Sequence, residues 1–186
     1  MKVLRKSEVD TDNFEVGDVI SFVLAHGEEA EAMAVKKEQD GMLFCFVNCL
    51  VNEYPMNCNG TNEGGYLASD LRNILNTVIL DDFPLKLRNR MVPLENGDLL
   101  RIPTEYEVSG HNIYGDVEEC AARWDPMKLH RNRIAFCNKS NCGECYWLMN
   151  DASHGRARSI IVDQYGFISY RSARYYYGVR PVFKLK

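Results

Sequence analysis

The sequence contains no long apolar run. No stretch approaches the roughly 20 consecutive apolar residues that a membrane-spanning helix needs. The charged residues at its start are not followed by the apolar segment of a secretory signal. We therefore expect a protein that does not enter a membrane and that stays in the cytoplasm.

A surplus of positive charge is also missing. The 22 Lys and Arg residues against 26 Asp and Glu give a formal net charge of -4. Because nucleic-acid binders neutralise phosphates with surplus Lys and Arg, we expect no nucleic-acid partner. The 46% of hydrophobic and 26% of charged residues are ordinary for a globular protein, and 186 residues suit a single domain over residues 1–186.

The cysteines do not form the even set of a small disulfide-stabilised scaffold. There are seven, irregularly spaced, which predicts reduced thiols in a cytoplasm. Cys137, Cys142 and Cys145 lie close together in the chain, and thiolates at such spacing can converge on a zinc or copper ion. No second CxxC pair accompanies them, so the alternative is a polar turn before a strand.

Strand patterns occupy both ends of the chain, and helix patterns lie between them. Residues 18–24, 29–37 and 42–51 alternate or are continuously apolar, with turn signals between them. Strand patterns return at residues 99–102, 134–137, 146–149, 159–163, 167–171 and 179–185. Strands followed by helices and again by strands predict an α+β fold, with antiparallel sheets and a few short helices in mid-chain.

The clearest helix follows the Asn- and Gly-rich residues 57–65. Ser69 is placed to cap it, and its apolar face is predicted to consist of Leu71, Ile74, Leu75 and Val78. Pro84 is suited to open a second short helix through residue 90.

Two further helix starts are indicated by capping-box spacing. Thr104 is followed by Glu107, and Asp116 is followed by Glu119. Asp125, which precedes a proline, is expected to end the last of these helices.

The last third of the chain interleaves arginine with aromatic residues. Tyrosine supplies a flat apolar face with a hydroxyl, and arginine supplies a planar fork of donors, so together they favour recognition surfaces. Packing of the aromatic rings with arginine stems laid along them is the structural alternative. The candidate ligand-binding residues are Arg156, Arg158, Arg171, Arg174 and Tyr175. Gly178 and Arg180 are expected in the closing strand, the glycine for close packing and the arginine to anchor loops.

Several segments resemble a family of uncharacterised bacterial and phage domains with a C-type-lectin-like fold. They are VGDVISF at residues 16–22, SDLRNILN at 69–76, LRIPTEYEV at 100–108, YWLM at 146–149, IIVDQYG at 160–166 and YGVRPVF at 177–183. The resemblance implies a single lectin-like domain, distantly related to the formylglycine-generating sulfatase modifiers. It implies no established activity.

Three hypotheses follow for the function. The first is a non-catalytic domain that recognises a glycan, a peptide or a protein. The second is a copper- or zinc-dependent oxidative enzyme built on Cys137, Cys142 and Cys145. The third is an intracellular or phage structural component.

Overall fold

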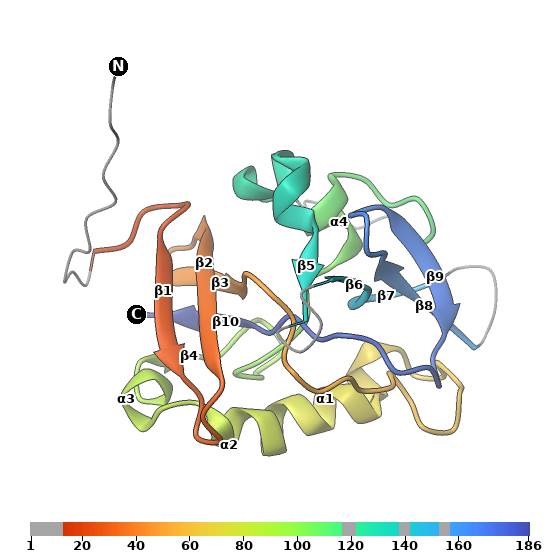
Figure 1. Ribbon diagram of the computed structural model, residues 1–186, viewed down its shortest axis with the longest axis horizontal. Coiled ribbons are helices and arrows are strands. Elements are labelled where there is room, and N and C mark those ends of the chain that lie inside the picture. The colour runs from red at the N-terminus through yellow and green to blue at the C-terminus, as the bar shows by residue number, and fades with distance from the viewer. Residues whose placement is uncertain (1–12, 117–121, 138–141, 153–156) are drawn as a thin grey trace.

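The computed structural model of the protein describes residues 13–116, 122–137, 142–152 and 157–186. The described residues form antiparallel sheets with short helices, which confirms the predicted α+β class. Figure 1 shows a large sheet beside a small three-stranded sheet, with helices α1 and α2 beneath them. Within these residues, no helix has the length and apolar character needed to cross a membrane.

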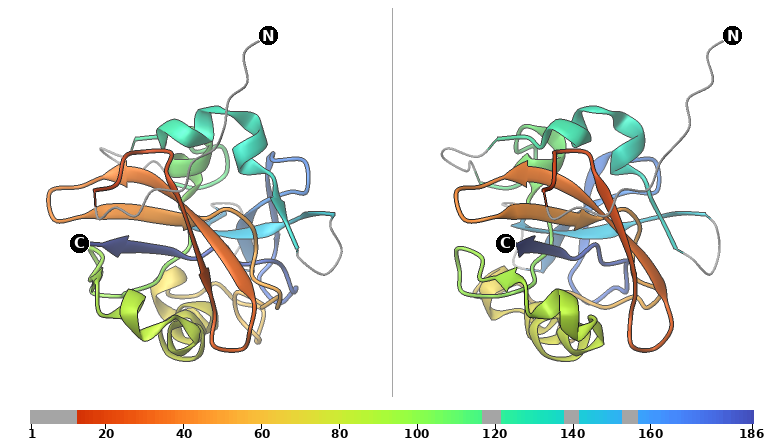
Figure 2. Two further views of the ribbon diagram at one scale, coloured as in Figure 1. Left: turned by 60° about the vertical axis from the view of Figure 1, so that its left-hand side comes forward. Right: turned by 90° about the vertical axis from the view of Figure 1, so that its left-hand side faces the viewer.

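The large sheet joins the N-terminal strands to the end of the chain. Its strand order is β1 (Val19–Val23), β2 (Glu29–Lys37), β3 (Met42–Phe46), β10 (Val182–Leu185) and β4 (Met91–Val92), and all its pairs are antiparallel. The sheet is strongly curled (Figure 2). Its concave side holds the main core, where the rings of Phe44 and Phe183, opposite each other on β3 and β10, stack at 5.6 Å. Strand β3 ends at Phe46 and not at the predicted residue 51. It is shorter because the chain beyond it turns from β2 toward residues 177–179, where Leu50 N–H donates to Val179 O (2.9 Å).

The predicted mid-chain helix consists of α1 (Asp70–Ile74), the π-helical turn η2 (Leu75–Ile79) and α2 (Leu80–Asp82). Ser69 caps it as predicted, since its hydroxyl accepts from Arg72 N–H (3.1 Å). The prediction that Val78 faces the core was wrong: Val78 is 60% exposed, whereas Ile79 is 3% exposed. A π-helical turn takes one more residue than an α-helical turn, which moves the buried face on by one position.

The other helices are single turns, namely η1 (Tyr66–Ala68), α3 (Leu85–Arg88), α4 (Glu105–Ser109), η3 (Asp125–Lys128) and η4 (His130–Arg133). Thr104 and Glu107 form the predicted capping box on α4. Asp125 opens η3 instead of ending a helix, because the following proline fits a first helical turn. The helix predicted from Asp116 and Glu119 falls largely on residues 117–121, outside the described residues.

The small sheet contains β7 (Tyr146–Asp151), β8 (Arg158–Val162) and β9 (Ile168–Ser172), which pair in antiparallel order. Its two faces pack on different cores. Trp147 and Ile161 belong to the main core, whereas Leu148 and Ile160 belong to a second core. A two-stranded sheet of β5 (Ala135–Phe136) and β6 (Gly143–Glu144) precedes it. Residues that follow one another along β8 or β9 therefore point to opposite sides of the molecule.

Candidate recognition site

The closing segment, residues 177–179, lies between two other segments of the chain. On one side Tyr177 forms an antiparallel bridge with Tyr54, and on the other Gly178 forms a parallel bridge with Tyr146. Gly178 N–H donates to Cys145 O (2.9 Å). A Cβ atom on Gly178 would lie 2.6 Å from the Cys49 sulfur, so no larger residue fits without displacement. The predicted role of this glycine in close packing is confirmed.

Arg180 anchors the same segment to the core. Its side chain is 3% exposed and donates from Nε to Phe46 O (2.9 Å), and from Nη1 to Asn132 O (3.2 Å) and to the Tyr146 hydroxyl (3.0 Å). The guanidinium carbon also lies 4.9 Å from the centre of the Tyr146 ring. These contacts confirm the predicted anchoring of neighbouring loops, and they leave Arg180 inaccessible to a ligand.

Three of the five predicted ligand-binding residues come together around Tyr177. The charge of Arg171 acts on the Tyr177 hydroxyl, and the Tyr177 ring lies 6.5 Å from that of Tyr175. The Arg174 guanidinium lies 5.9 Å from the centre of the Tyr175 ring. We call these four residues, Arg171, Arg174, Tyr175 and Tyr177, the tyrosine–arginine surface.

The tyrosine–arginine surface is held on a rigid base. The Tyr177 ring packs edge-on against Trp147 at 5.1 Å, and the Trp147 indole N–H donates to Tyr54 O (2.8 Å). Arg171 is positioned by Ser169, whose hydroxyl oxygen accepts from Nη1 at 3.0 Å. Burial raises the pKa of Tyr177, although the charge of Arg171 acts in the opposite direction. Tyr177 is therefore a neutral hydroxyl at physiological pH.

The other two predicted residues lie elsewhere. Arg158 is opposite Ser172 in the β8–β9 register, so its side chain is on the far face of the small sheet from Arg171. There its guanidinium lies over the Tyr170 ring at 4.9 Å. The structure therefore does not bring Arg158 and Arg171 together, and the ligand-binding role of each stays a prediction. Arg156 lies outside the described residues.

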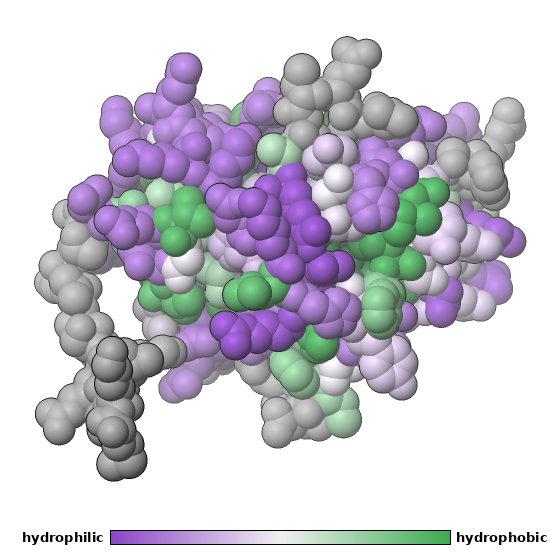
Figure 3. Space-filling view, turned by 90° about the horizontal axis from the view of Figure 1, so that it is seen from above, coloured by the Kyte–Doolittle hydropathy of each residue, from purple (hydrophilic) through white to green (hydrophobic). Residues whose placement is uncertain are grey.

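The surface offers accessible charge and aromatic area. Arg171 and Arg174 are both exposed, and neither forms an ion pair within the part of the chain that the structure describes. Tyr175 is 47% exposed and the adjacent Tyr176 is 62% exposed. The face of the molecule seen in Figure 3 is mainly hydrophilic and carries several hydrophobic patches.

The three cysteines predicted as metal ligands have different surroundings. Cys137 is buried near Cys49, Cys142 is exposed, and Cys145 lies beside Arg171 with its thiol 3.3 Å from the Gln164 side-chain oxygen. Burial raises the pKa of Cys145, which disfavours the thiolate that metal binding requires. In the described ranges, no three His, Cys, Asp or Glu side chains are arranged to hold a metal ion.

Two glutamates influence the ionisation of the chain near the closing segment. The stem of Glu144 on β6 lies beside Cys49 at Gly178, and the carboxyl group of Glu53 acts on that of Glu144. A Cβ atom on Gly178 would lie 2.9 Å from the Glu144 Cγ, so the Glu144 stem packs directly on the bare glycine. Partial burial, with the hydrogen bond and negative charge of Glu53 added, raises the pKa of Glu144 from 4.5 to about 7.

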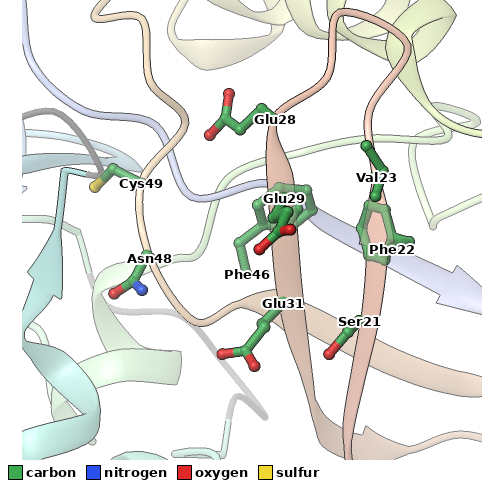
Figure 4. Close-up of a pocket in the computed structure, with 10 residues that line it drawn as sticks. Ser21, Phe22, Val23, Glu28, Glu29, Glu31, Phe46, Asn48 and Cys49 are labelled. Atoms are coloured by element: carbon green, nitrogen blue, oxygen red, sulfur yellow. The ribbon is translucent and has the colours of Figure 1, made fainter.

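A cleft with a volume of about 660 Å³ lies between β2 and the chain around Cys49. Figure 4 shows Glu28, Glu29 and Glu31 of this cleft opposite Asn48 and Cys49. The cleft is acidic, because its lining residues include these three glutamates and no Lys or Arg. Its glutamates could have been found from the sequence, since Glu29 and Glu31 alternate with alanine and so share one strand face.

The long-range contacts of Tyr177 and the Glu53–Glu144 pair carry no such local pattern. They depend on segments that are distant in the sequence. Comparison with known proteins adds no relative: no family model, no curated protein and no solved structure matches the chain.

Proposed function

We propose that this chain is a non-catalytic recognition domain of C-type-lectin-like fold. Its tyrosine–arginine surface would bind an anionic group, such as a carboxylate or sulfate, on a glycan, a peptide or a protein. The lectin-like assignment is supported by the sequence resemblance together with the antiparallel α+β architecture. The binding role rests mainly on one observation, the exposed Arg171 that Ser169 and the Tyr170 carbonyl oxygen hold in place.

The chemistry of the surface suits such a ligand. Arg171 donates from Nη1 to the Ser169 hydroxyl and to the Tyr170 carbonyl oxygen, and it has no carboxylate partner among the described residues. An incoming anion would supply that partner through charge-assisted hydrogen bonds. Tyr175 adds flat apolar area next to the charge, and tyrosine and arginine are the residue types that dominate binding energy at interfaces.

The test is binding of the purified chain to arrays of anionic glycans and acidic peptides, followed by affinity measurement on the hits. We expect Arg171→Ala, and separately Tyr175→Ala, to weaken binding at least about tenfold without changing the melting temperature. Arg158→Ala is the matched control, because it removes an exposed arginine from the opposite face of the same sheet. Loss of binding in Arg158→Ala alone would place the site on the other face and refute this proposal.

The acidic cleft favours a second binding function, the capture of a cationic group such as a lysine or arginine side chain. Glu29 and Glu31 are exposed, and neither takes part in an ion pair among the described residues. The double variant Glu29→Gln/Glu31→Gln should abolish binding of basic peptides and leave binding of acidic ligands unchanged. If the wild type and the double variant bind basic peptides equally well, the cleft is not the binding site for the cationic group.

The copper- or zinc-dependent enzyme stays a prediction. The surroundings of Cys137 and Cys145 lend it no support, because one thiol is buried near Cys49 and the other lies at the tyrosine–arginine surface. Elemental analysis after loading with either metal would decide it.

A further inference from the structure

Strand β1 forms one edge of the large sheet. It pairs with β2 on one side, and among the described residues no strand pairs with its other side. Its sequence, VISFV, contains neither Lys nor Pro, with which many edge strands prevent pairing with another chain. At the opposite edge of the sheet, β4 has only 2 residues. Strand β1 is therefore the longer of the two edges.

The register with β2 determines which backbone groups of β1 point outward. At one end of the pair, Ala34 N–H donates to Asp18 O (2.8 Å). At the other end, Leu24 N–H donates to Glu28 O (2.8 Å). Because bonded and non-bonded positions alternate along an antiparallel pair, the even-numbered residues of β1 bond to β2. The odd-numbered residues direct their N–H and C=O groups away from β2, and they are Val19, Ser21 and Val23.

Negative charge borders this edge on the outer face of the sheet. The side chains of the odd-numbered residues lie on that face, because the even-numbered residues pack on the main core. Ser21 is opposite Glu31 and Val23 is opposite Glu29, so the two glutamates share the outer face with them (Figure 4). Both glutamates are exposed, and neither forms an ion pair among the described residues. Their carboxylates are therefore accessible from the edge.

We propose that the β1 edge binds an extended peptide, which pairs with it as an added antiparallel strand and carries Lys or Arg at every second position. This proposal rests on the proposed capture of a cationic group by the acidic cleft. A peptide residue opposite Ser21 lies on the face of Glu31, two strand spacings or roughly 10 Å from it. The long stem of a Lys or Arg crosses the small Ser21 side chain and brings the charge to the carboxylate.

The two parts of the contact have different roles. Backbone hydrogen bonds to the three outward-facing residues provide affinity for any extended chain, and the glutamates select a basic one. A second copy of this protein fits less well. Its β1 strand carries no cation and is bordered by the same glutamates, so pairing of two β1 edges would leave the negative charge without a partner.

Peptides methylated on their backbone nitrogens test the strand addition. The parent peptide alternates lysine with valine. In antiparallel pairing, the residues opposite Ser21 and Val23 direct their own N–H groups to β1, and they are the lysines because they share the face of the glutamates. Methylation of the lysine amide nitrogens should weaken binding, measured by calorimetry, at least about tenfold. Methylation of the valine amide nitrogens should change it less than about twofold. Equal binding of the two methylated peptides, or the reverse order, would overturn the proposal.

Amide exchange of the protein, followed by NMR, is a second measurement that needs no variant. The parent peptide should slow the exchange of the Val19, Ser21 and Val23 amides at least about tenfold. The Val182 amide donates to Arg101 O at the far side of the sheet and serves as the internal control. Unchanged exchange of the three β1 amides with the peptide bound would contradict the strand addition.

Ser21→Pro removes one outward N–H at a position where an edge strand tolerates proline. It should weaken binding of the parent peptide at least about tenfold, whereas Ser21→Ala keeps the N–H and should bind as the wild type does. Sedimentation that shows a dimer of the free protein, separated into monomers by Ser21→Pro, would assign the edge to a second copy and overturn the proposal.

The double variant Glu29→Gln/Glu31→Gln separates the strand addition from the function on which it rests. If it loses the parent peptide while the two methylated peptides bind the wild type equally, cation capture holds and the strand addition fails. If it binds the parent peptide as well as the wild type does, and lysine methylation alone abolishes binding, cation capture fails and the strand addition holds.

Discussion

Replacement of Glu144 by glutamine should make the stability of this protein less dependent on pH. The folded-state pKa of Glu144 is raised from 4.5 to about 7, so folding favours the protonated form. The contribution of this group to stability is fully present below pH 4.5, and it is lost as the pH rises through 7. If the carboxyl were fully buried, the loss would be roughly 3 kcal/mol. Glu144 is only partly buried and solvent screens its repulsion from Glu53, so we expect about 1 kcal/mol.

Urea unfolding at several pH values between 5 and 8 measures this difference. The free energy of unfolding of Glu144→Gln minus that of the wild type should increase by about 1 kcal/mol from the acidic to the alkaline end. Glu29→Gln removes an exposed glutamate that has no carboxyl partner in the described part of the chain, and its difference from the wild type should stay flat. A flat difference for Glu144→Gln as well would refute the reasoning, because it would mean that neither burial nor Glu53 destabilises the ionised form of Glu144.

Four further substitutions test the packing of the fold by urea unfolding. Gly178→Ala should lower the free energy of unfolding by roughly 1–3 kcal/mol, because the new methyl group would overlap the Cys49 sulfur; an unchanged midpoint would show that the segment yields freely. Arg180→Met should cost about 2–4 kcal/mol, since it leaves the buried acceptors of the guanidinium unpaired; a neutral effect would contradict the anchoring role. Ile79→Ala should cost at least about 2 kcal/mol and Val78→Ala less than about 0.5 kcal/mol, whereas the reverse order would disprove the π-helical turn.

Local patterns in the sequence were sufficient for much of the fold. Alternation and turn signals located most strands of the large and small sheets, and the caps at Ser69 and Thr104 located two helices, because these signals act within a few residues. The short strand β4 was missed, and the strand predicted at residues 99–102 is only a bridge from Arg101 to Val182. Val78 was wrongly predicted to face the core, because the α-helical period does not reveal a π-helical turn. The division of Arg158 from Arg171 was also missed. It depends on which face of β8 and β9 packs on which core, and aromatic residues on both faces hide that choice.

The position of Tyr177 bears on how the proposed recognition site would bind a ligand. Binding loses free energy when mobile side chains must become ordered. Tyr177 is already ordered, because its backbone lies in the Tyr54 bridge and its ring packs on Trp147 in the main core. Arg171 is likewise held on a strand by Ser169 and by the Tyr170 carbonyl oxygen. A ligand at the proposed site would therefore meet preformed donors and an aromatic face, and the backbone of the closing segment would contribute through the order that it imposes on Tyr177.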